Sequence, residues 1–364
     1  MKMLRPGIAI KHDASVLKQR TSSEFSSLLI SFNQEAGNTL DYYESYKATA
    51  VNENINTASV LGSAVKSYFE MGGVDLYLLN YAQIQAFDLY DFEDFIRSYC
   101  DSLEDLEIIF MPTLLDDFAL QTVPVVKIMN IVNDYAKKSD RISICDVNEN
   151  ILKNELDNIN ETLIYYPAFI DKNDKRVAAS VVASALLSKL AQEEKFFHSI
   201  ANKKINYLSQ QEKVLNKSDV KDLEIDGINP IIYQRSLGHR IWGVRAFNSQ
   251  FNSVNEMRSM KYIKRQLKAL SREFLFESNS ISLHDRLFFK INYFLNSLWQ
   301  LGALSGATQD EAYILNAQYN EDDKGDNTLI FSLSVALSRP LEFITIKLHR
   351  LENDDMGGHI SMES

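Results

Sequence analysis

Residues 106–111 read Leu-Glu-Ile-Ile-Phe-Met, and Pro112 follows them directly. A short apolar run that ends at a proline is typical of a buried strand. On either side of it, apolar side chains recur every three or four residues over 92–103 and 123–137, which predicts two helices. Another apolar run, over 142–147, predicts the next strand. This alternation of strand and helix indicates an α/β layer domain.

The same alternation continues in both directions, over about residues 24–205. The additional elements that we expect are strands over 24–32, 74–79 and 162–166, and helices over 56–70 and 177–203. Gly72 and Gly73 end the first of these helices, because glycine readily adopts the left-handed conformation of a helix C-cap. Residues 206–224 are polar and charged, which predicts a linker.

A second unit follows this linker. It is predicted to contain helices over 253–276 and 283–301 and strands over 240–247, 312–319, 329–337 and 341–351. The expected organisation is an N-terminal arm at 1–20, an inserted α/β middle domain at 21–205, a linker at 206–224, a C-terminal domain at 225–350 and a tail at 351–364.

Composition excludes several classes of protein. The chain has 364 residues, 45% of them hydrophobic and 24% charged, which is ordinary for a globular protein and excludes a disordered chain. Its net charge of −11 argues against a general nucleic-acid binder. Cys100 and Cys145 are expected to be two buried free thiols. The N-terminus lacks the apolar run of a signal peptide and no stretch approaches a membrane span, so we expect a soluble protein made without export.

The sequence contains none of the common catalytic motifs. It has no phosphate-binding loop, no Gly-x-Gly-x-x-Gly and no Gly-x-Ser-x-Gly, and its six histidines lack the spacing of a zinc site. Asp116 and Asp117 are interpreted as acidic surface, and 322–326 as a charged turn instead of a calcium loop. We therefore expect no catalytic residues, no metal and no cofactor.

A row of basic residues runs along the first helix of the second unit. Its members, spaced by three and four residues, are Arg258, Lys261, Arg265, Lys268 and Arg272. The row is either a solvated face whose aliphatic stems cover the core, or a lattice docking stripe for an acidic partner such as another copy of the chain. We adopt the second interpretation because of the resemblance described next. It predicts that changing Arg265 and Lys268 to Glu blocks assembly without unfolding the monomer.

Seven segments, in order along the chain, resemble the contractile tail sheath proteins of phages, R-type bacteriocins and related contractile injection systems. They are Arg5-Pro6-Gly7-Ile8-Ala9-Ile10, 61–79, Leu163-Ile164-Tyr165-Tyr166-Pro167, 227–231 with 241–246, 262–265 with 276–279, 294–306, and Arg339-Pro340-Leu341-Glu342-Phe343-Ile344. The chain departs from the family at 197–202, where the usual Gly-Val-Trp-Lys-Ala-Pro-Ala-Asn segment is reduced. Its length leaves room for only one inserted domain, so it resembles a minimal sheath protein.

The resemblance implies both a fold and a function. The fold would be a C-terminal sheath domain completed by the N- and C-terminal arms of neighbouring subunits, with one α/β domain inserted. The function would be that of a structural subunit, not an enzyme, that stacks in six-fold rings around an inner tube. Contraction of this sheath would drive the tube through a target membrane.

Partners and location also follow from the resemblance. The partners would be copies of the chain itself, an inner tube protein, and baseplate and terminal cap proteins, without nucleic acid and without direct membrane insertion. Assembly would take place in the bacterial cytoplasm and yield part of a phage tail-like particle, either released or membrane-anchored. Two alternatives stay open, a low-copy variant near the cap or collar and an α/β enzyme with an unrecognised site.

Two further sets of residues are assigned to assembly. The inter-subunit arms would use Pro6, Gly7, Ile8, Ile10, Phe343, Ile344, Ile346 and Leu348. The tube-facing surface would use Asp285, Arg286, Lys290, Asp310 and Glu311, although a role for these five in solvent or in the lattice is an equal alternative.

Overall fold

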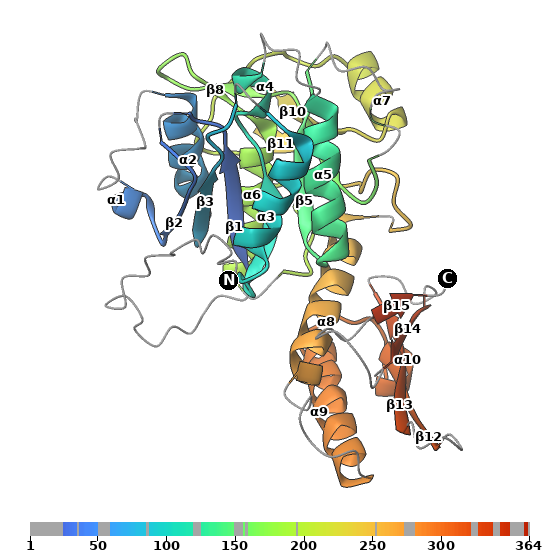
Figure 1. The fold of residues 1–364 in the computed structure, drawn as a ribbon. Coiled ribbons are helices and arrows are strands. Elements are labelled where there is room, and N and C mark those ends of the chain that lie inside the picture. Colours follow the sequence, from blue (N-terminus) through green and yellow to red (C-terminus); the bar gives the residue numbers. More distant parts are fainter. Residues whose placement is uncertain are drawn as a thin grey trace, which may run out of the picture.

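A computed structural model gives the structure of the protein (Figure 1). It describes residues 25–34, 36–49, 59–84, 87–118, 125–148, 156, 159–193, 196–251, 253–272, 281–321, 327–337, 343–349 and 360–362. The expected N-terminal arm, the calcium-loop-like turn at 322–326 and most of the expected C-terminal tail lie outside the described residues.

An eight-stranded sheet forms the centre of the larger domain, in the order β11-β10-β6-β5-β4-β1-β3-β2. Its strands are β1 (Ser26–Ser31), β2 (Thr39–Tyr43), β3 (Leu76–Asn80), β4 (Leu106–Phe110), β5 (Ile142–Asp146), β6 (Leu163–Tyr166), β10 (Asn229–Gln234) and β11 (Gly238–Ile241). The inner pairs are parallel, whereas β2 and β11 pair antiparallel at the two ends. The α/β prediction is confirmed.

Helices cover both faces of this sheet. The helices of one face are α2 (Val60–Glu70) and α6 (Ala179–Gln192), and those of the other are α3 (Leu89–Cys100) and α5 (Val125–Lys138). Within β1, Leu29 belongs to the first of the two cores and Leu28 and Ile30 to the second. A strand buried on both faces must be apolar at successive positions, which explains the continuous apolar runs in the sequence.

The second unit contains two long helices and an antiparallel sheet. The helices are α8 (Val254–Arg272) and α9 (Ile281–Gln300), and the sheet has the order β12-β13-β14-β15. Its strands are β12 (Tyr313–Glu321), β13 (Asn327–Ala336), β14 (Phe343–His349) and β15 (Ile360–Met362). Figure 1 shows α8 leaving the α/β domain, with α9 and the small sheet beside it. The apolar stripe of α8 is buried at Met257, Met260, Ile263 and Leu267, as its period requires.

Several short elements complete the chain. They are α1 (Tyr46–Thr49), α4 (Leu114–Asp117), α7 (Lys217–Ile225), α10 (Gln309–Ala312), and a small sheet of β7 (Phe169–Ile170), β8 (Arg176–Val177) and β9 (Gln210–Gln211). The helix α7 lies in the segment predicted as a linker, and it begins at a capping box formed by Asn216 and Asp219.

The expected domain boundary near residue 205 does not coincide with the edge of the large sheet. Strand β10 pairs in parallel with β6, and β11 pairs with β10. Residues 229–241 therefore extend the sheet of the α/β domain, and the second unit begins with α8.

Candidate assembly surfaces

The basic row of α8 points into its own chain. Arg258 donates two hydrogen bonds to the carboxylate of Glu107 on β4, at 2.7 and 2.6 Å. Both side chains are 0% exposed. The guanidinium also lies over the ring of Phe25, 5.6 Å from its centre. A bidentate pair of this kind joins α8 to the central sheet.

The next members of the row bind the turn between α5 and β5. Lys261 donates to the carbonyl of Arg141 at 2.8 Å, and Arg265 donates to the carbonyl of Asp140 at 2.9 Å. The ammonium of Lys268 lies 2.6 Å from the carboxylate of Asp140. Burial lowers the pKa of Lys261 to about 8, although the nearby carboxylates of Glu161 and Asp140 oppose this shift.

The prediction of a lattice docking stripe is wrong for Arg258 and Lys261, which are buried inside the subunit. Arg265 and Lys268 contact Asp140 of the same chain, and only the last member, Arg272, is well exposed, beside Glu104 at 3.0 Å. The alternative of a solvated face is equally wrong for the buried members. Helical spacing places the five cations on one side of α8, but it does not identify the acidic groups that they meet.

The predicted C-terminal arm lies in the small sheet. Phe343, Ile344, Ile346 and Leu348 belong to β14, and they pair with Ala336, Val335, Leu333 and Phe331 of β13 in the same chain. The predicted N-terminal arm residues Pro6, Gly7, Ile8 and Ile10 lie outside the described residues. Within the described part of the chain, β12 pairs with a strand on one side only.

The residues predicted to face a tube come from two neighbouring helices. Asp285, Arg286 and Lys290 are exposed on α9, and Asp310 and Glu311 are exposed on α10, which contacts α9. Glu311 also has a local role, because its carboxylate accepts a hydrogen bond from the backbone N–H of Ala307 at 2.7 Å. The contact with a tube stays a prediction.

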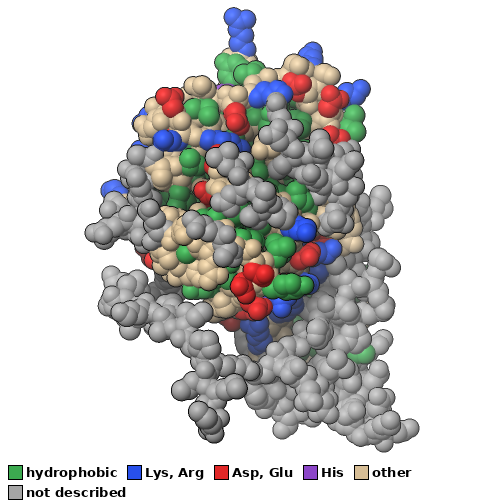
Figure 2. All heavy atoms as spheres, turned by 45° about the horizontal axis from the view of Figure 1, so that its top comes forward, with side chains coloured by type: hydrophobic (Ala, Val, Ile, Leu, Met, Phe, Trp, Pro, Cys, Tyr) green, Lys and Arg blue, Asp and Glu red, His purple; other side chains and the backbone are tan. Residues whose placement is uncertain are grey.

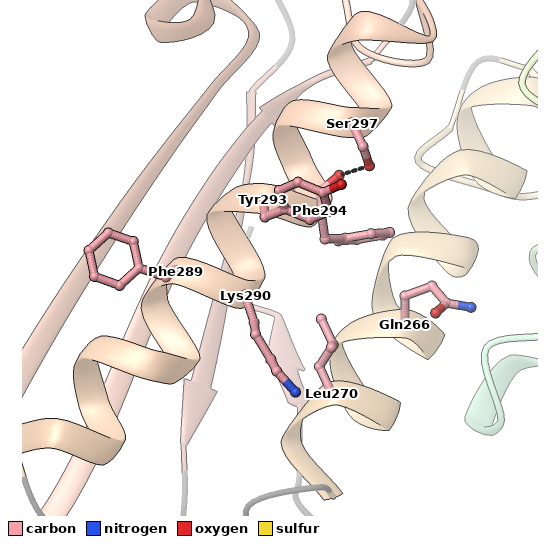
Figure 3. A pocket seen from close by; sticks show the side chains of 7 residues that line it. All are labelled: Gln266, Leu270, Phe289, Lys290, Tyr293, Phe294 and Ser297. Carbon is pink, nitrogen blue, oxygen red and sulfur yellow. Dashed lines mark hydrogen bonds between the residues drawn. The ribbon is translucent and has the colours of Figure 1, made fainter.

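Sequence reasoning did not find a hollow that lies between α8 and α9. It has a volume of about 480 Å³ and is lined by Gln266, Leu270, Phe289, Lys290, Tyr293, Phe294 and Ser297. In Figure 3, Leu270 on α8 faces Lys290 and Phe294 on α9. At its rim Phe289 and Tyr293 are 68% and 76% exposed. Their spacing of four residues along an otherwise amphipathic helix is the signal that sequence reasoning left unused.

The outer surface of the α/β domain is mixed in charge. Figure 2 shows acidic and basic side chains interspersed over one face, with apolar side chains between them. Among the described helices, none is both long and apolar enough to span a bilayer.

Comparison with known proteins places the fold. No family model and no curated protein matches the chain. It is similar to the contracted helical sheath of the anti-feeding prophage, with 20% identity, a TM-score of 0.74 and coverage of 93% of this chain and 97% of that one. The contracted sheath complex of PVC, an extracellular contractile injection system, is similar with 19% identity, coverage of 94% and 97%, and a TM-score of 0.71.

The chain has the fold of a contractile sheath protein. A chain of the anti-feeding prophage baseplate shares this sheath fold, with 19% identity, a TM-score of 0.73 and coverage of 98% of this chain and 100% of that one. Because each match spans nearly the whole of both chains, the sheath fold includes the α/β domain as well as α8, α9 and the small sheet.

One polar cluster in this chain occupies the place where α/β enzymes often hold their ligands, beyond the carboxyl ends of the parallel strands. Asp146, at the end of β5, accepts hydrogen bonds from the backbone N–H and the hydroxyl of Ser180, at the N-terminus of α6. Arg176 and Asp116 form an ion pair nearby, at 3.1 Å. These hydrogen bonds give the cluster a structural role, because the carboxylate of Asp146 accepts from an N–H group that has no partner within the first turn of α6.

The other groups that could carry chemistry are metal-binding side chains and free thiols. The described residues contain no group of three or more His, Cys, Asp or Glu side chains that could hold a metal ion. Cys100 and Cys145 are buried free thiols, as predicted, and burial raises the pKa of each to about 12. A raised pKa makes a thiol a poor nucleophile at neutral pH.

Asp146 should make the stability of the protein depend on pH. Burial raises its pKa to about 6, despite the opposing influence of Arg176 and Ser180. An aspartate in the unfolded chain titrates at about pH 4. Between these values the folded state binds more protons than the unfolded state, so the free energy of unfolding falls as the pH rises from about 4 to 6. We expect Asp146→Asn to reduce this fall by up to about 3 kcal/mol.

Urea unfolding at several pH values between 4 and 7 measures this effect. The matched control is Asp94→Asn, because Asp94 is an exposed aspartate on α3 and its replacement should leave the profile unchanged. Burial also raises the pKa of Asp117 to about 6, so part of the fall should persist in the Asp146→Asn variant. A profile that is unchanged in that variant would contradict the assignment to Asp146.

Proposed function

We propose that this chain is a structural subunit of a contractile sheath. It would polymerise as stacked hexameric rings around an inner tube, and contraction of the polymer would drive the tube through a target membrane. Its partners would be other copies of itself, the tube protein, and baseplate and terminal cap proteins. This function needs no nucleotide, metal or cofactor, and no catalytic residue.

The observation that carries this proposal is the whole-chain match to sheath structures. The match to the anti-feeding prophage sheath covers 93% of this chain and 97% of that one, so no large part of either fold lacks a counterpart. An α/β enzyme would share only its α/β domain with such proteins. The second unit, from α8 onward, therefore supports a sheath and not an enzyme.

We propose that terminal arms connect the subunits through the small sheet. A strand edge offers unpaired N–H and C=O groups to a strand of another chain. A borrowed strand of about five residues makes about five hydrogen bonds, each worth about 1 kcal/mol net. One such contact gives only weak dimers at micromolar concentration. Several contacts per subunit in a closed ring lattice supply the required avidity.

The tube would be contacted by α9 and α10 in this proposal. The supporting observation is that Asp285, Arg286, Lys290, Asp310 and Glu311 are exposed on adjacent helices. Exposed charges at an interface mainly set specificity and the rate of association, which suits a sheath that must grip and then slide past a tube.

We further propose that subunits assemble in the bacterial cytoplasm and become part of a phage tail-like particle. A second candidate is a sheath variant present in few copies at one end of the particle. The similarity to a chain of the anti-feeding prophage baseplate, with coverage of 98% and 100%, favours this candidate over an enzyme.

Electron microscopy of negatively stained particles tests the function. The protein is expressed alone and together with the cognate tube protein, and we expect long striated tubes or hollow cylinders. Deletion of residues 1–20 should abolish the polymers, and circular dichroism checks that the deletion variant remains folded. Polymers formed by the deletion variant would contradict the role of the arm. Small uniform particles from the intact protein would favour the low-copy variant.

A further inference from the structure

The α8–α9 hollow lies at the place where the N-terminal residues join the described structure. Phe25 is the first described residue, and its ring stacks on that of Tyr262 on α8, with 5.0 Å between centroids. Tyr262 in turn lies 6.2 Å from Phe294 of α9, which lines the hollow. The chain that precedes Phe25 therefore begins next to one end of the hollow.

The hollow extends along α8 away from this point. Tyr262, Gln266 and Leu270 are spaced by four residues and so share one face of the helix. From Tyr262 to Leu270 the helix rises by about 12 Å. The hollow is lined mainly by aromatic and aliphatic side chains, and Phe289 and Tyr293 at its rim are 68% and 76% exposed. Exposed aromatic side chains grouped around a concave surface mark a binding site for apolar groups.

We infer that residues 14–20 of the same chain occupy the α8–α9 hollow. Leu17 and Val16 are the apolar side chains nearest to Phe25 on its N-terminal side, because residues 18–24 are all polar or charged. Phe25 follows Leu17 by eight positions, which span up to about 28 Å when the chain is extended. This length exceeds the extent of the hollow, so Leu17 and Val16 reach it without strain.

The connection through Phe25 favours this occupant over a second copy. A tether of this length gives an effective concentration in the millimolar range, which exceeds that of free protein in a dilute solution. Docking would fix the direction in which residues 1–13 leave the subunit. The consequence for assembly rests on the proposed function, because only a polymer uses these residues as an arm. The docking itself concerns the single subunit.

Disulfide trapping in the unassembled monomer tests the proposal. The trapping variant is Lys18→Cys with Lys290→Cys, which keeps Leu17 and Val16 and places one thiol at the hollow. The control is Lys18→Cys with Asp285→Cys, because Asp285 is an exposed residue of the same helix that does not line the hollow. The native Cys100 and Cys145 are 0% and 2% exposed, so they do not compete.

We expect the trapping variant to form an intramolecular disulfide about ten-fold faster than the control under mild oxidation, measured on non-reducing gels and by peptide mass spectrometry. Adding Val16→Asp and Leu17→Asp should lower the rate to that of the control. Equal rates in the trapping and control variants would overturn the proposal. A disulfide-linked dimer from the trapping variant would also overturn it, by identifying a second copy as the occupant. Tube formation is measured separately, so docking and sheath function can fail independently.

Discussion

Replacing Arg258 with Ala should lower the free energy of unfolding by about 3–5 kcal/mol, because it leaves the carboxylate of Glu107 buried without its partner. Both side chains are 0% exposed and are joined by two short hydrogen bonds. An ionised carboxylate without a counter-charge in such a site is strongly unfavourable. The change should appear as a lower midpoint in chemical denaturation of the monomer.

Two further variants make this prediction specific. Arg272→Ala removes the exposed pair with Glu104, whose side chains are 63% and 80% exposed, and should cost at most about 1 kcal/mol. Combining Arg258→Met with Glu107→Leu removes both charges and should restore most of the stability. If Arg258→Ala is as stable as Arg272→Ala, the buried pair does not hold α8 to the sheet.

Changing both Arg265 and Lys268 to Glu should destabilise the monomer by about 4 kcal/mol, before any effect on assembly. The sequence alone predicted that this change blocks assembly and leaves the monomer folded. In the structure, Lys268 lies 2.6 Å from the carboxylate of Asp140 and Arg265 lies 4.0 Å from that of Glu107. The side chains of Arg265 and Lys268 are only 11% and 31% exposed. Two new carboxylates would therefore repel the existing ones at short range.

Thermal unfolding of the purified variant, monitored by circular dichroism, measures this effect. Adding Asp140→Lys to the double variant restores opposite charges beside Lys268→Glu, and it should recover part of the lost stability. A double variant that unfolds like the original protein but does not polymerise would support the docking stripe after all. This experiment separates a contact within the subunit from a contact between subunits.

Elements with strong periodic patterns could be predicted from the sequence. Apolar runs located β1, β3, β4, β5 and β6, because a strand buried on both faces has apolar side chains at successive positions. Stripes at a spacing of three and four located α8 and α9 within a few residues. Gly72, at a φ of +97°, ends α2 as expected.

Weak patterns were missed for identifiable reasons. Strand β10 was missed, and β11 (Gly238–Ile241) was predicted only in part, as the start of a strand over 240–247. Both strands are short and contain Asn229, Pro230 and Gly238, residues that are more common in turns. Strand β10 forms because β6 offers a partner more than sixty residues earlier in the chain, and β11 then pairs with β10. The helix predicted over 177–203 ends at Gln192. The prediction was too long because no local sequence signal shows where the packing of α6 against α2 stops.

The alternation of strands and helices, the two buried thiols and the likeness to sheath proteins could be predicted from the chain alone, because they depend on local periodicity and short motifs. The tertiary structure decided what the basic row of α8 does. Arg258 and Glu107 are 151 residues apart, and only folding brings them together. It also decided that a hollow lies between α8 and α9, since the gap depends on how the two helices pack. Charge pairing and packing are long-range, so local patterns in the chain do not specify them.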